Sequence, residues 1–147
     1  MTVTWPRLSL PPLNLWNVPK MDSITGGDVI NQLVSLIHED NVKAGWWKDK
    51  DGNDIRNNMY CFSNKLALVH SELSEALEAD RKGLADSHLP HRDGREVEMA
   101  DAIIRLFDLA GAYGMDLGGA FVEKRAYNSK RQDHKLENRN AVGGKSY

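Results

Sequence analysis

The chain has 147 residues, of which 41% are hydrophobic and 27% charged, and its formal net charge is -2. This length suits one domain with its own core, and the composition is that of a globular chain. The acidic balance argues against a protein that coats nucleic acid, because such proteins usually carry a basic surplus. The single Cys61 cannot form an internal disulfide and no apolar stretch approaches 20 residues, so we expect a soluble, cytoplasmic protein.

Residues 1–22 are predicted to form an extended N-terminal arm. Four of the five prolines lie in this segment, and proline fixes φ and removes a backbone donor. The segment is also apolar, so we expect it to pack on its own helices or on a neighbouring subunit. Its large apolar residues are Trp5, Leu8, Leu10, Leu13, Leu15 and Trp16.

Residues 23–134 are predicted to form one helical domain, followed by an irregular tail over residues 135–147. Four helices are expected over residues 28–44, 60–82, 93–113 and 116–131. Gly45 and Gly83 follow the first two helices as stop signals, and Asp116 can cap the fourth. No convincing alternating strand pattern occurs, so we predict an all-α fold, a four-helix bundle.

Each of the first three helices carries an apolar stripe that we expect to face the core. The stripes are Val29, Leu33, Leu36 and Ile37 in the first helix, Leu66, Val69, Leu73 and Leu77 in the second, and Met99, Ile103, Leu106 and Ala110 in the third.

Two acidic pairs are the strongest functional signal. Glu72 and Glu75 lie in the second helix, and Glu98 and Asp101 lie in the third. The i,i+3 spacing puts both carboxylates of a pair on one side of a helix. Four carboxylates on neighbouring helices would repel each other unless a cation lay between them. Hard divalent ions such as Mg²⁺ take oxygen ligands and also bind phosphate oxygens, so the pairs predict a magnesium site for a phosphate substrate.

The surroundings of the two pairs differ. The side of the second helix that carries the first pair also carries small and apolar residues, namely Leu68, Ala76 and Ala79. This predicts a partly covered face, on which buried carboxylates need a partner. The second pair belongs to a longer charged row that could equally be a solvent face with ion pairs. That row is Glu98, Asp101, Arg105 and Asp108.

The sequence lacks the patterns that mark other kinds of metal and phosphate sites. A redox di-metal bundle needs Glu-x-x-His repeats on two helices, and the five histidines do not have that spacing. No H-E-x-x-H motif, cysteine cluster or glycine-rich phosphate loop occurs.

Cationic and aromatic residues supply candidate substrate contacts. Lys124, Asn128 and Arg131 are spaced i, i+4, i+7 and could bind phosphate, or could simply suit the end of an amphipathic helix. Trp46 and Trp47 could stack on a nucleobase, or pack in the core and on the surface.

His38 and Asn41 precede the tryptophan pair on the first helix, and both could line the same pocket. A role in the core or on the surface is the alternative, and it is favoured for His38.

These motifs, in this order, resemble the MazG-like all-α nucleoside triphosphate pyrophosphohydrolases, including phage and bacterial members. The motifs are Gly45-Trp46-Trp47, the run from Ser71 to Glu78, Glu98-Met99-Ala100-Asp101, and Lys124 with Asn128 and Arg131. The resemblance covers roughly residues 28–134.

The resemblance implies cleavage of a (d)NTP between the α- and β-phosphates, giving a (d)NMP and pyrophosphate with Mg²⁺ or Mn²⁺. It implies metal ligation by Glu72, Glu75, Glu98 and Asp101. In the mechanism that we expect, Glu72 or Glu75 orients the attacking water or takes its proton. The resemblance also implies substrate contacts from Lys124, Asn128, Arg131 and the aromatic pair, and assembly as a homodimer or homotetramer.

Two other functions stay open at this point. One is a non-catalytic helical module that binds nucleotide or a partner. The other is a specialised dUTP or phosphoribosyl-ATP pyrophosphohydrolase with the same metals. The polar loop over residues 48–58 is longer than the family pattern, so the base pocket need not follow the family.

Overall fold

The computed structural model describes residues 25–140 and 142, and this part of the chain is helical, which confirms the all-α class. The helices are α1 (Gly26–Lys43), α2 (Cys61–Lys82), α3 (Gly94–Ala112), α4 (Leu117–Lys130) and α5 (Leu136–Arg139). Short 3-10 turns occupy Ile55–Asn57 and Gln132–His134. The arm predicted over residues 1–22 lies outside the described residues. Among the helices described, none has both the length and the apolar character needed to cross a membrane.

The ends of the four main helices lie within two residues of their predicted positions. Gly83 adopts φ 65° and ends α2, as glycine in the left-handed region does. Asp116 accepts a hydrogen bond from Gly119 N and caps α4. α1 begins earlier than predicted because Thr25 and Asp28 form a capping box around its first turn. The tail predicted to be irregular contains one short helix, α5.

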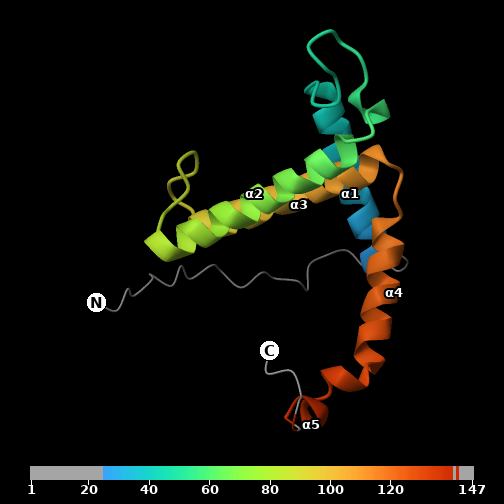
Figure 1. Ribbon diagram of the computed structural model, residues 1–147, viewed down its shortest axis with the longest axis vertical. Helices are drawn as coiled ribbons and strands as arrows, with labels where there is room; N and C mark the ends of the chain where they lie inside the picture. The colour runs from blue at the N-terminus through green and yellow to red at the C-terminus, as the bar shows by residue number, and fades with distance from the viewer. Residues whose placement is uncertain (1–24, 141, 143–147) are drawn as a thin grey trace, which may run out of the picture.

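α2 and α3 form a long antiparallel hairpin, as Figure 1 shows. α1 packs against α3, and α4 packs against α1 and runs away from the hairpin. The contact between α1 and α4 depends on two glycines, because a Cβ at Gly118 would collide with the backbone of Gly27. The fold therefore places α3 between α1 and α2 and leaves α4 to one side.

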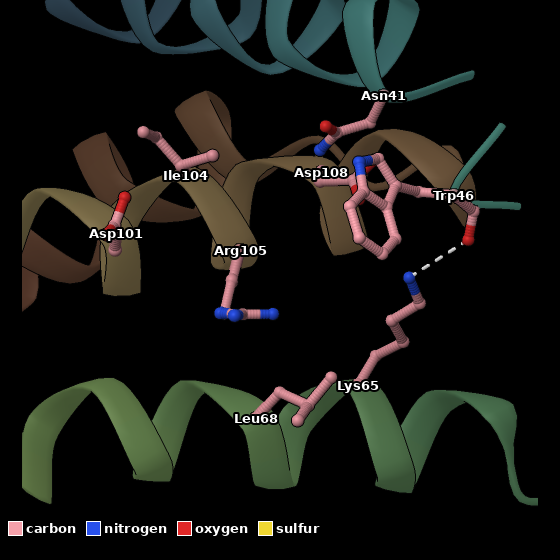
Figure 2. Close-up of a pocket in the computed structure, with 8 residues that line it drawn as sticks. All are labelled: Asn41, Trp46, Lys65, Leu68, Asp101, Ile104, Arg105 and Asp108. Atoms are coloured by element: carbon pink, nitrogen blue, oxygen red, sulfur yellow. Dashed lines mark hydrogen bonds between the residues drawn. The ribbon is translucent and has the colours of Figure 1, made fainter. Parts of the chain in front are cut away.

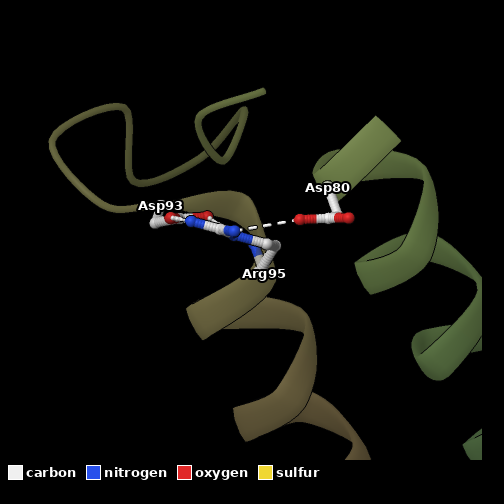
Figure 3. Close-up of polar contacts among 3 residues, drawn as sticks. All are labelled: Asp80, Asp93 and Arg95. Carbon is white, nitrogen blue, oxygen red and sulfur yellow. Dashed lines mark hydrogen bonds and ion pairs between the residues drawn. The ribbon is translucent and has the colours of Figure 1, made fainter. Parts of the chain in front are cut away.

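A three-residue ion network ties the end of α2 to the start of α3 (Figure 3). Arg95 Nη1 donates to Asp80 Oδ1 of α2 at 2.9 Å, and Arg95 Nε donates to Asp93 at 3.1 Å. Asp93 in turn caps α3 by accepting from Arg95 N. The guanidinium thereby holds the two helices in register at the closed end of the hairpin.

The predicted apolar stripes of α2 and α3 do not form the core of the chain. Val69 and Ala110 are buried, but Leu73 is 50% and Leu77 60% exposed. We call the exposed members the apolar flank of the hairpin. It consists of Leu66, Leu73 and Leu77 of α2 with Met99, Ile103 and Leu106 of α3. The physical reason is that the two helices approach through small residues, such as Ala79 and Ala102, so the bulky residues lie beside the contact.

The first helix departs from its predicted stripe in the same way. Val29, Leu33 and Leu36 are exposed, whereas Val34 is buried. The core around the site is built instead from Trp47, Cys61 and Leu109, with Ile55 packed against them.

Candidate functional site

The packing of α2 on α3 brings three of the four predicted metal ligands together. Glu72, Glu98 and Asp101 each contribute a carboxylate oxygen, and the three oxygens lie within 4.8 Å of one another. Glu72 is only 6% exposed, as expected for the covered side of α2. Glu75, the fourth predicted ligand, is exposed and lies outside this group of three, although its charge acts on Glu98.

Crowding of negative charge perturbs the cluster. Burial raises the pKa of Glu98, and the neighbouring charges of Glu75, Glu72 and Asp101 raise it further. Burial and the charge of Glu72 likewise raise the pKa of Asp101, with Arg105 acting in the opposite direction. The ionised carboxylates thus destabilise one another, and a cation among them would relieve that repulsion.

One cation of the chain already contacts the cluster. Arg105 Nε lies 2.6 Å from Glu72 Oε1, so the guanidinium offsets the charge of the most buried acid. The Arg105 side chain is 42% exposed and lines an adjoining pocket. Arg105 therefore links the acid cluster to that pocket.

A pocket of about 450 Å³ lies between α1, α2 and α3. Figure 2 shows Asp101 at one end and Trp46 at the other, with Arg105 between them. Its polar and aromatic lining residues are Asn41, Trp46, Lys65, Asp101, Arg105 and Asp108. Asp101 belongs both to this wall and to the acid cluster, so the two features form one continuous site.

The inner end of the pocket is built around a buried carboxylate. Asp108 is 5% exposed, and its Oδ1 accepts from Trp47 Nε1 at 2.8 Å and lies 2.8 Å from His38 Nδ1. A carboxylate only accepts, so His38 Nδ1 is the donor of that contact. Trp47 itself is 3% exposed and packs with Cys61 and Leu109. Its position is that of a core residue that orients Asp108.

The two adjacent tryptophans have different environments. Trp46 is 65% exposed and lines the pocket, so it is the aromatic residue that a ligand can reach. Lys65 Nζ donates to Trp46 O at 3.2 Å and lies 4.5 Å from the centre of the Trp47 ring. Lys65 thus holds the tryptophan turn against α2.

The three residues predicted on the last helix do not line this pocket. Lys124 Nζ lies 4.9 Å from the centre of the Tyr127 ring. Arg131 Nε donates to Asp133 Oδ1 at 3.0 Å. Asn128 Oδ1 is buried and has no hydrogen-bond partner among the described residues. Among the described residues of one chain, the cationic side chains that line the pocket are Lys65 and Arg105.

Four residues of the pocket were missed as site residues or left undecided. Arg105 and Asp108 stand four and seven residues after Asp101, a spacing that indicated one row without indicating that the row faces a pocket. Asn41 was a candidate only through its position before the tryptophans. Nothing in the sequence indicated Lys65, because a lone lysine on a helix is usually solvated.

The donor set of the cluster suits a hard cation. It contains carboxylate oxygens and neither histidine nor cysteine, which favours Mg²⁺, Mn²⁺ or Ca²⁺ over zinc. Among the residues that the structure describes, no other group of three potential ligands is comparably close. Comparisons with protein-family models, with curated proteins and with solved structures found no match to this chain.

Proposed function

We propose that this chain is a MazG-like, Mg²⁺-dependent nucleoside triphosphate pyrophosphohydrolase that converts a (d)NTP into a (d)NMP and pyrophosphate. The main support for the proposal is that Asp101 belongs both to the acid cluster and to the pocket wall. Asp108 lies seven positions after Asp101 in α3, which is about 10 Å along the helix axis. That span suits a nucleotide with its base beside Asp108 and its phosphates beside the acids.

Glu72, Glu98 and Asp101 would hold the ion, with Glu75 beside them. A bound divalent cation supplies charge neutralisation and a bound water of lowered pKa. Glu75 is exposed and outside the group of three, so its carboxylate is available to accept a proton from water. Glu72 Oε1 is paired with the Arg105 guanidinium, so Glu72 is less suited than Glu75 to accept a proton, and we assign it a ligand role.

Arg105 and Lys65 are the side chains at the pocket that can offset phosphate charge. Arg105 has a planar fork of donors, so it can bind a phosphate oxygen with the donors that Glu72 does not use. Lys124, Asn128 and Arg131 stay predicted substrate contacts, and the site within one chain does not include them.

We further propose a cytoplasmic homodimer or homotetramer in which helices of two copies complete a four-helix bundle. The support is the apolar flank, where six large side chains of α2 and α3 are at least one-third exposed. A contiguous apolar surface of this kind is typical of a protein interface. A second copy, related by a two-fold axis, would cover the same flank on both chains.

The deciding experiment measures pyrophosphate and orthophosphate release from each common (d)NTP and dUTP. Each substrate is incubated with Mg²⁺ and, separately, with EDTA. The proposal expects pyrophosphate and the monophosphate in equal amounts, with Mg²⁺ only. Release of orthophosphate, or nucleotide binding without any product, would overturn it, and the second result would favour the non-catalytic module.

A further inference from the structure

The inner end of the pocket contains an oxygen that the protein leaves without a partner. Asp108 Oδ1 takes both hydrogen bonds of the carboxylate, from Trp47 and from His38. Asp108 Oδ2 has no hydrogen-bond partner among residues 25–140, and it keeps some contact with solvent. An unpartnered carboxylate oxygen on an almost fully buried residue that lines a pocket is suited to receive a donor from a ligand.

Two further groups line the same pocket. The Asn41 side chain on α1 lines the same pocket and makes no hydrogen bond within the described residues. The Trp46 indole extends between Asn41 and Lys65, as Figure 2 shows. An acceptor oxygen, a free amide and a flat aromatic face are the three elements that bind the edge and the face of a nucleobase.

We propose that Asp108 selects an amino-bearing nucleobase, with Asn41 reading the adjacent ring atom and Trp46 stacking on the ring. This inference rests on the proposed function, because it assigns the base end of the same substrate. Cytosine and adenine each offer an exocyclic amino donor next to an unprotonated ring nitrogen, to which the Asn41 amide can donate. Each of these amino groups can donate to Asp108 Oδ2.

Uracil and thymine differ at this edge. Both carry a carbonyl oxygen where cytosine carries the amino group, and that oxygen would face the carboxylate of Asp108. The two acceptors would repel each other as long as the ring stays in the position that cytosine takes, because the ring N–H of uracil would then face Asn41 and not Asp108. The pocket therefore discriminates against uracil through chemistry rather than size, since cytosine and uracil have nearly the same shape.

The first measurement compares binding of CMP and UMP to the full chain in EDTA by titration calorimetry. We expect CMP to bind at least about tenfold more tightly, the ratio given by one hydrogen bond to a charged group. Equal affinity for the two nucleotides would overturn the inference. Because neither metal nor triphosphate is present, this result does not depend on hydrolysis.

The second measurement uses Asp108→Asn. The amide keeps one oxygen for Trp47 and His38 and presents its NH₂ group to the pocket, where it can donate to the uracil carbonyl. The ratio of CMP to UMP affinity should fall at least about tenfold. In Trp46→Ala, by contrast, both affinities should fall together and the ratio should hold, because stacking tolerates any base.

An unchanged ratio in a folded Asp108→Asn variant would also overturn the inference. If that variant does not fold, Asn41→Ala provides the test, since loss of its amide should lower the same ratio. The two proposals fail separately. A base preference without pyrophosphate release contradicts only the activity, and pyrophosphate release without a base preference contradicts only the role of Asp108.

Discussion

The two flanks of the α2·α3 hairpin are built on opposite principles. We call the side that holds the acid cluster and the pocket the polar flank; its wall combines the carboxylates of Asp101 and Asp108 with Trp46, Leu68 and Ile104. The other flank exposes large apolar side chains, including Leu73 and Leu77, to solvent. A monomer optimised for stability would do the reverse. On the proposed function, a ligand would complete each flank: a cation and a nucleotide on one side, and a second copy of the chain on the other.

The largest expected effect comes from the polar flank. Glu72→Gln keeps the shape of the side chain but removes the buried negative charge of the cluster. We expect pyrophosphate release to fall about 1000-fold, the effect of losing several kcal/mol of transition-state stabilisation. Steady-state assays with a saturating (d)NTP and Mg²⁺ would measure the loss.

Glu78→Gln is the matched control for this substitution. Glu78 is on the same helix but pairs with Lys82 at the surface, outside the acid cluster. Its removal should change the rate by less than about twofold. Similar losses in both variants would mean that the polar flank has no special role.

Glu75→Gln should abolish release while leaving the fold intact, and wild-type turnover in that variant would exclude Glu75 as the proton acceptor.

The apolar flank gives the second largest effect. Leu73→Asp would place a charge in the proposed interface. Because a two-fold axis relates the copies, each copy would contribute one such charge. Lost burial and added desolvation should cost about 3 kcal/mol or more, so that the dissociation constant rises at least about 100-fold. Sedimentation velocity over a range of concentrations would follow the change.

Leu136→Asp supplies the comparison for the interface variant. Leu136 is an exposed leucine of α5, outside the apolar flank. It should leave the sedimentation profile unchanged. A wild-type chain that sediments as a monomer at micromolar concentration would contradict the interface altogether.

Sequence reasoning recovered the local structure well and the tertiary assignment only in part. Gly83 and Asp116 fixed helix ends because caps are local chemistry. The side on which Glu72 is buried was also predictable, from the small residues that share it. The exposure of Leu73 was not, because an apolar stripe marks burial without saying whether the same chain or another copy provides the cover.

The site followed the same division. The acid pairs on α2 and α3 were predicted, and the helix packing brings three of the four together. The choice between Trp46 and Trp47 depended on which indole reaches the core. Tertiary packing decides that, and the sequence of two adjacent tryptophans does not predict it. The sequence placed Asp108 only in a charged row that could be either a metal-binding side or a solvent face. Its role depends on contacts with Trp47 and His38, which lie in distant parts of the chain.

Metal binding should stabilise the polar flank measurably. At a Mg²⁺ concentration 100 times the dissociation constant, a single site adds about 2.7 kcal/mol to the free energy of unfolding. For a chain of this size, that raises the melting temperature by roughly 5–10 °C. Thermal melts with Mg²⁺ and with EDTA would show the difference. Glu72→Gln should lose most of it, and an equal shift in that variant would place the ion elsewhere.

The smallest expected effect is a gain in stability on neutralising the cluster. The pKa of Glu98 is raised in the folded chain, so its contribution to stability is fully present below the unfolded pKa and is lost as pH rises through the folded pKa. In EDTA, Glu98→Gln should therefore be more stable than wild type at neutral pH, by about 0.5–1 kcal/mol, and the gain should vanish at acidic pH. Urea unfolding at both pH values measures it. A loss of stability at neutral pH would mean that Glu98 is held by a favourable partner and not by mutual repulsion, and the polar flank would then have no intrinsic demand for a cation.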